Sequence, residues 1–296
     1  KNLKTALFSS ILLLLISYPI LGLKLSVVGI SLQVQGASAQ TLWTIGIAAV
    51  LFLYLPLYSS LGGDGQLEAM ISSLPKELVD TLGYDQISTG AGYAQSTFFG
   101  LIGFLLLTIA AVIWGSAAIA GAEESGRAEL DLAHGIGRGQ YALESALAVL
   151  VRLLWLGAFA GLVVWALNGP SELGIDDRNI VGASAALTGL AFLTASAALL
   201  AGAATGRRIW ATGVGAGIAV LGYILQALAK QSKDLEWLNA LSPYAWVYQR
   251  PPLSEGVDLG GLALTWGLAI VFVVASVFAL RLSLIHISEP TRLRRI

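Results

Sequence analysis

Apolar stretches of about twenty residues recur along the chain between polar connections, and this length lets a helix cross the hydrocarbon core of a bilayer. A membrane barrel would instead show short strands of alternating polarity. The pattern therefore predicts an all-α fold, a polytopic transmembrane helical bundle. The expected spans are residues 5–23, 42–59, 97–119, 146–167, 179–204, 209–229 and 260–281.

The distribution of charge predicts how these spans are oriented. Basic residues in short loops favour the cytoplasmic side of a membrane, and Arg207 and Arg208 stand in a very short loop. Alternation then places residues 120–144 in the cytoplasm and residues 230–259 outside. The segment 5–23 is one span too many for this alternation, so it is expected as an extra N-terminal hydrophobic helix beside six regular spans.

Composition narrows the chemistry that the chain can carry. Hydrophobic residues make up 56% of the sequence and charged residues 12%. The chain has no cysteine, so a thiolate metal site, a disulfide and a cysteine nucleophile are excluded within it. With only two histidines, His134 and His286, and a net charge of −1, we expect no metal site and no nucleic-acid partner.

Residues 120–144 gather charge in the middle of an otherwise apolar chain. The stretch "AELDLAHGI" predicts a short interfacial helix with Leu130, Leu132 and Ile136 on its membrane side. Glycines after it would break the helix and redirect the chain into the next span. Its charged face would then be free to meet a soluble partner; the alternative is a solvated loop with no partner.

The stretch "IAGAEESGRAELDLAHGIGRGQYALESALA" resembles the first cytoplasmic loop of the type-two ABC exporter permeases. In that family this loop includes a coupling helix that docks on the ATP-binding subunit. The segment "HGIGRGQ" departs from the family, which often has a proline there. The resemblance implies ATPase-docking roles for Glu123, Glu124, Gly126, Glu129, Leu130, Leu132 and Arg138.

The stretch "LNALSPYAWVYQRPPLSEGVD" resembles the segment that precedes the last span in the same family. Its aromatic residues, with Trp237 before them, suit a membrane interface. Two roles stay open, anchoring at the interface and a direct part in the exit path. The resemblance marks an extracellular interfacial motif of Ser242, Pro243, Trp246, Pro252, Leu253 and Gly256. Residues 58–83 also resemble the family, with an amphipathic helix expected near 66–82.

The two ends of the chain resemble other sequences. Residues 6–50 resemble the start of permeases that import branched-chain amino acids, and residues 283–296 resemble a translated sequencing adapter. We therefore expect an exporter transmembrane domain over 46–281, joined to a foreign segment over 1–45 and a non-native tail over 282–296. A genuine basic tail is the alternative for the C-terminal end.

Together the resemblances imply a membrane-spanning permease subunit of an ATP-driven ABC exporter. No Gly-Lys pair occurs, so the chain lacks a phosphate loop and is expected to be a transport subunit without its own ATPase site. ATP would bind the partner subunit, and no cofactor is expected in this chain. The expected partners are the ATP-binding-cassette ATPase, a second permease subunit (an identical copy or a paired homologue) and the lipid bilayer.

The few ionisable groups inside the spans favour an apolar or amphiphilic cargo, such as a drug or natural product; export of a lipid or a polysaccharide is the alternative. A multi-pass location in the cytoplasmic membrane of a prokaryote is expected. The alternative function is a branched-chain amino-acid import permease, supported only by residues 6–50. An intramembrane enzyme would need paired ionisable groups inside the spans, and the sequence offers no such pair away from the membrane edges.

Overall fold

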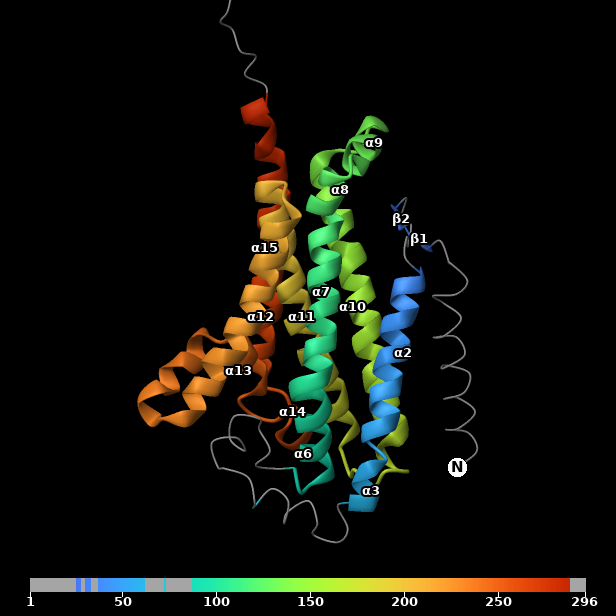
Figure 1. Ribbon diagram of the computed structural model, residues 1–296, viewed down its shortest axis with the longest axis vertical. Coiled ribbons are helices and arrows are strands. Elements are labelled where there is room, and N and C mark those ends of the chain that lie inside the picture. The colour runs from blue at the N-terminus through green and yellow to red at the C-terminus, as the bar shows by residue number, and fades with distance from the viewer. Residues whose placement is uncertain (1–24, 28–29, 33–36, 62–71, 73–86, 288–296) are drawn as a thin grey trace, which may run out of the picture.

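The molecule is a bundle of long apolar helices. A computed structural model describes residues 25–27, 30–32, 37–61, 72 and 87–287. Within them, six helices are long and apolar enough to cross a membrane, and they run side by side along the long axis (Figure 1). The predicted all-α transmembrane bundle is confirmed. The spans are Ala39–Ser60, Gly90–Ala118, Arg138–Asn168, Asp177–Thr205, Arg208–Gln231 and Leu259–Leu282.

Each span contains one principal helix, and two spans are interrupted near one end. The principal helices are α2 (Ala37–Tyr54), α7 (Gly103–Ala118), α10 (Arg138–Asn168), α11 (Asp177–Thr205), α12 (Arg208–Gln231) and α15 (Leu259–Ile287). A turn separates α2 from α3 (Leu57–Leu61). The second span begins with α6 (Gly90–Ala94) and a π-helical segment, η1 (Gln95–Ile102), before α7.

Helix α11 lies at the centre of the bundle. It contacts α7, α10, α12 and α15, and most of its side chains are buried. Small residues make this close packing possible, as the abundance of Gly and Ala predicts. A Cβ at Gly115 of α7 would lie only 2.7 Å from the carbonyl oxygen of Ala195 in α11, and one at Gly157 of α10 would collide with Thr188.

The short helices gather at the two ends of the bundle (Figure 1). We call one end the charged end; it carries α8 (Ala120–Glu124) and α9 (Arg127–Ala133). The opposite, aromatic end carries α3, α6 and the segment before the last span. That segment consists of the 3-10 helix η2 (Lys233–Leu241), α13 (Pro243–Tyr248) and α14 (Pro252–Glu255).

Two short strands precede the first described span. Strand β1 (Leu25–Val27) pairs antiparallel with β2 (Ile30–Leu32), with Leu25 opposite Leu32. The expected extra helix over 5–23 lies outside the described residues, and so does the amphipathic helix near 66–82 apart from one residue. Both stay predictions, as do the expected boundaries of the foreign segment and the non-native tail.

Candidate functional site

Glycines shape residues 120–138 at the charged end, which we call the docking segment after the role that the resemblance implies. Helix α8 follows α7 directly, and Gly126 between α8 and α9 has φ of 71°. Helix α9 ends at Ala133, and Gly135 has φ of 85°. Positive φ costs glycine little and other residues more, so these two positions fix the bends on either side of α9. The predicted short helix and its glycine terminator are confirmed, but Ile136, which was expected on the membrane side of this helix, lies beyond its end.

The two leading glutamates face the turn between α11 and α12. Glu124 Oε1 accepts a hydrogen bond from the backbone N–H of Arg208 at 2.7 Å, at the first residue of α12. A carboxylate at this position also complements the positive end of the helix dipole. A Cβ at Gly206 would lie 3.0 Å from Glu123 Oε2. Glu123 and Glu124 therefore join α8 to the neighbouring turn.

Burial changes the titration of one of these carboxyl groups. It raises the pKa of Glu123 above its ordinary value, and the positive charge of Arg138 lowers that pKa by less. Arg138 is half-buried at the first position of α10. Of the seven residues with expected docking roles, these two thus influence each other through charge, from opposite ends of the docking segment.

Helix α9 projects from the bundle and carries the exposed part of the segment (Figure 1). Glu129 and Asp131 are exposed, and so is Leu130, with 65% of its surface accessible. Leu132 is half-buried, and Ala128 is the buried residue of this helix. We call Glu129, Leu130 and Asp131 the docking surface. The name follows the role that the resemblance implies. Because consecutive helical residues point about 100° apart, these three side chains surround the exposed side of α9.

Two contacts that the sequence analysis missed hold the docking segment to the spans. Tyr141 of α10 donates a hydrogen bond from its hydroxyl to the carbonyl oxygen of Ala118, at 3.1 Å. A Cβ at Gly139 would lie 2.5 Å from Nε of Arg281, so the guanidinium of α15 rests on the first turn of α10. The "GRG" sequence around Gly139 was the one local sign of a close approach.

At the aromatic end, Ser242 joins α13 to α12. Its hydroxyl donates to the carbonyl oxygen of Gly222 at 2.5 Å and accepts from the N–H of Ala245 at 3.0 Å. Ser242 is fully buried and caps α13, whose first residue is Pro243. Proline suits this position because the first helical N–H has no partner inside the helix.

Leu253 joins α14 to two further elements. Its N–H donates to Gln95 Oε1 of η1 at 3.4 Å, and its carbonyl accepts from Asn179 Nδ2 of α11 at 3.0 Å. Pro252 and Leu253 are buried, and the turn after α14 closes at Gly256 with φ of 87°. The motif expected from the sequence to be interfacial is therefore integrated into the bundle at both of its short helices.

The aromatic residues of this region divide into two groups. Trp237 is exposed, as interface anchoring predicts, whereas Tyr244 and Tyr248 are buried. The hydroxyl of Tyr244 donates to the carbonyl oxygen of Gly100 in η1, at 2.5 Å. Trp246 is half-buried and donates from Nε1 to Ala240 O at 2.8 Å. The expectation that both tyrosines lie at the interface is wrong, because helix α13 turns them into the bundle.

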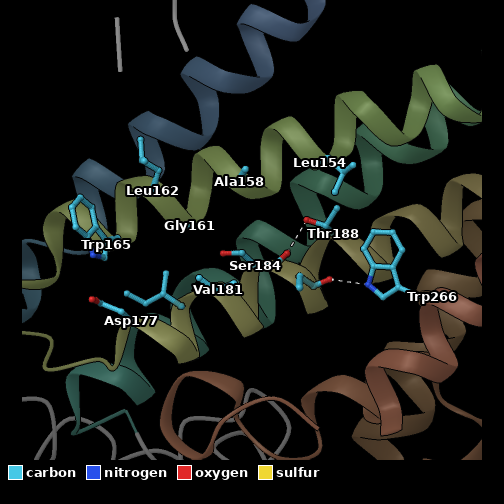
Figure 2. A pocket seen from close by; sticks show the side chains of 12 residues that line it. Leu154, Ala158, Gly161, Leu162, Trp165, Asp177, Val181, Ser184, Thr188 and Trp266 are labelled. Atoms are coloured by element: carbon cyan, nitrogen blue, oxygen red, sulfur yellow. Dashed lines mark hydrogen bonds between the residues drawn. The ribbon is translucent and has the colours of Figure 1, made fainter. Parts of the chain in front are cut away.

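A pocket of about 490 Å³ lies between α10, α11 and α15 (Figure 2). Its walls are mainly apolar, and its carboxyl and hydroxyl groups come from α11. The sequence analysis did not find it, because the space depends on how far apart three helices pack. The residues that define it best are Leu154, Ala158, Asp177, Ser184, Thr188 and Trp266.

The part of the chain that matches a known protein family contains nearly all of these features. The family model described as multidrug efflux system permease Rv1217c, C-terminal domain, matches residues 25–281. The chain belongs to this family. No curated protein and no solved structure gave a significant match. The chain is thus a permease subunit of an efflux system and a multi-pass membrane protein, and its family implies other transporter components as partners.

The matched range includes both groups of expected site residues and the pocket. It begins at residue 25 of the permease, ahead of the expected boundary near residue 45, and ends at Arg281. The foreign origin of residues 1–45 and the adapter origin of 283–296 gain no support from this match. Among the described residues, no three His, Cys, Asp or Glu side chains group as a metal site requires; the absence of a metal and a cofactor stays a prediction.

Proposed function

We propose that the permease is the membrane subunit of an ATP-driven ABC exporter and that a separate ATPase binds the docking surface. One observation carries this proposal. Helix α9 projects from the charged end with Glu129, Leu130 and Asp131 exposed, while the adjoining α8 contacts α7, α11 and α12. A force on α9 would therefore be transmitted through α8 to α7, α11 and α12.

The proposed mechanism follows from these attachments. Closure of two ATP-bound subunits would push α9 toward the membrane. Glu124 would pass the displacement to the start of α12, and Tyr141 and Gly139 would pass it to α10 and α15. The spans would tilt, and the population would shift between inward-open and outward-open states, which ATP favours to different degrees.

The aromatic end supplies the proposed exit path. Helix α14 is bound there to η1 and α11 through Gln95 and Asn179. A π-helical turn is often found at functional positions within helices, and η1 lies directly against this segment. Movement of the spans would therefore alter the contacts of α13 and α14, which form the end of the route.

Six spans make half of an export pore, so a second permease subunit, identical or homologous, is part of the proposal. The charged end would face the cytoplasm, because Arg207 and Arg208 occupy the short turn between α11 and α12 there. The location would be the cytoplasmic membrane of a prokaryote. The efflux family favours export over the import of branched-chain amino acids.

Charge reversal on the docking surface tests the proposed ATPase contact. The double variant Glu129→Lys with Asp131→Lys should weaken association with a co-expressed ATP-binding-cassette subunit about tenfold, because interfacial charges must be complementary. Co-purification from detergent-solubilised membranes measures the association. Both side chains are exposed, so the amount of membrane-inserted permease should stay the same.

Asp234→Lys together with Glu236→Lys is the matched control, because both carboxylates are exposed at the aromatic end and the net charge changes by the same amount. This variant should retain the ATPase as wild type does. Wild-type retention by the α9 double variant would exclude α9 as the docking element. Equal losses in the α9 double variant and the control would also count against it, since the effect would then come from net charge.

A further inference from the structure

The pocket between α10, α11 and α15 has the size and walls of a small-molecule site. Its volume of about 490 Å³ lies within the range of about 300–1,000 Å³ that such sites usually have. Leu154, Leu162 and Val181 supply aliphatic walls, and Trp165 and Trp266 supply aromatic ones. Leu154 and Val181 are exposed, so the pocket opens on the flank of the bundle.

The pocket extends from the aromatic end toward the middle of the membrane. Asp177, the first residue of α11, lines it at that end, and Thr188 lines it eleven residues further on. At 1.5 Å per helical residue this separation is about 16 Å, roughly half of the hydrocarbon thickness. A molecule dissolved in one half of the bilayer could thus enter from the side.

The polar groups of the pocket have the character that attracts a cation. Asp177 places an exposed carboxyl group there, and no Lys, Arg or His is among the lining residues. The indole of Trp266 also faces the pocket (Figure 2), and aromatic faces attract cations in apolar surroundings. No basic side chain among the lining residues would offset the repulsion between this carboxylate and an anion.

A buried hydroxyl gives a second, independent sign of a ligand. Ser184 is buried, with 9% of its surface exposed, and its Oγ has no hydrogen-bond partner among the described residues. The hydroxyl faces Gly161, where an added Cβ would collide with it (Figure 2). A buried polar group without a partner is unfavourable unless something else satisfies it.

We propose that this pocket is a cargo-binding site for a monovalent organic cation with an apolar body, which enters from the half of the bilayer next to the aromatic end. The body packs against the aliphatic and indole walls, and the positive charge lies near Asp177. Ser184 Oγ is available to a polar group of the cargo. This inference rests on the proposed export function, because it names the class of compound exported.

Direct binding of a hydrophobic cation tests the site without the ATPase. The probe is tetraphenylphosphonium, titrated calorimetrically into the purified full chain in lipid nanodiscs, with binding to empty nanodiscs subtracted. Wild type should bind it saturably. Asp177→Asn should weaken binding about fivefold by removing the charge at constant size, and Ala158→Trp should abolish it by filling the pocket from an exposed position on α10.

Two matched controls separate the pocket from general charge effects. Asp176→Asn changes the adjacent carboxylate, which caps α11 and does not line the pocket, so it should bind as wild type does. Tetraphenylborate has the same shape with a negative charge. It should bind the wild-type pocket more weakly than the cation and should gain affinity in Asp177→Asn.

Several results would overturn the inference. They are a lack of saturable cation binding, unchanged binding in both Asp177→Asn and Ala158→Trp, or equal losses in Asp177→Asn and Asp176→Asn. A co-purified phospholipid that Ala158→Trp displaces, without cation binding, would identify a lipid as the occupant. A change of oligomeric state in that variant, again without cation binding, would identify a second copy of the chain.

The assay also distinguishes this inference from the function on which it rests. If cation binding fails while the ATPase still associates through α9, the pocket assignment falls and the export proposal stands. If cation binding holds while the ATPase does not associate, the docking assignment falls and the pocket remains a binding site of the permease.

Discussion

Single polar side chains decide how the short helices attach to the spans. The side-chain oxygen of Ser242 joins α13 to α12, and one carboxylate oxygen of Glu124 joins α8 to the first residue of α12. In both cases a backbone group at a helix end is satisfied by a side chain, which the first turn of a helix requires. Replacing such a residue with alanine leaves a backbone group at a helix end without its partner.

Ser242→Ala should lower the free energy of unfolding by about 1–2 kcal/mol, because it removes the cap of α13 and a buried hydrogen bond to α12. The midpoint of thermal unfolding in detergent measures the loss. Ser232→Ala provides the comparison, since Ser232 caps η2 from an exposed position, with a longer hydrogen bond of 3.3 Å to Asp234 N. Similar midpoints for the two variants would refute a special role for Ser242.

At the scale of the helix, apolar length predicts where spans lie and does not predict where helices end. All six described spans were predicted, yet α10 begins at Arg138, eight residues before the expected apolar stretch. Its polar first turns continue the helix beyond the membrane, which hydropathy cannot detect. The connection expected over 120–144 is therefore shorter and contains two helices.

The candidate site could be predicted only in part, for a related physical reason. The sequence indicated α9 and its glycine terminator because both are local features. It did not indicate that Glu124 meets Arg208, that Arg281 rests on Gly139, or that Tyr244 is buried. Those contacts depend on the packing of elements distant in sequence, and so does the pocket, whose width is set by the side chains of three helices.

Close packing between α13 and α15 gives a test at this scale. A Cβ at Gly261 would collide with the backbone carbonyl of Trp246, whereas one at Gly267 of the same helix would meet nothing within 4 Å. Gly261→Ala should destabilise the permease by about 1–3 kcal/mol, despite the better helix propensity of alanine. Thermal unfolding measures the change, and Gly267→Ala should leave stability unchanged or raise it. The reverse order of the two variants would contradict the observed approach.

For the whole molecule, the positions of the charged and aromatic ends predict which residues a reagent on each side of the membrane can reach. The chain has no cysteine, so single cysteines can be introduced without a background. Ser125 is exposed at the charged end and Ser254 at the aromatic end. A membrane-impermeant maleimide added to intact cells should label Ser254→Cys and leave Ser125→Cys unlabelled.

In inside-out vesicles the labelling should be reversed, with Ser125→Cys reactive and Ser254→Cys protected. The opposite result in both preparations would invert the proposed orientation. Labelling of both positions from one side would mean that an even number of crossings lies between them. That result would conflict with the three spans, α10, α11 and α12, that separate α8 from α14. The experiment thus measures both the orientation of the permease in the membrane and whether the number of spans between the two positions is odd or even.

The burial of α11 has a consequence for how the permease is made. Its neighbours cover it on most sides, and its composition is rich in Ala, Gly, Ser and Thr rather than Leu and Ile. Small side chains let such a helix approach its neighbours closely, so its stabilising contacts are with other helices more than with lipid. During synthesis α7 and α10 precede it, whereas α12 and α15 emerge later, so α11 completes its packing only after the last span has been made. Biogenesis is therefore cooperative across the last three spans.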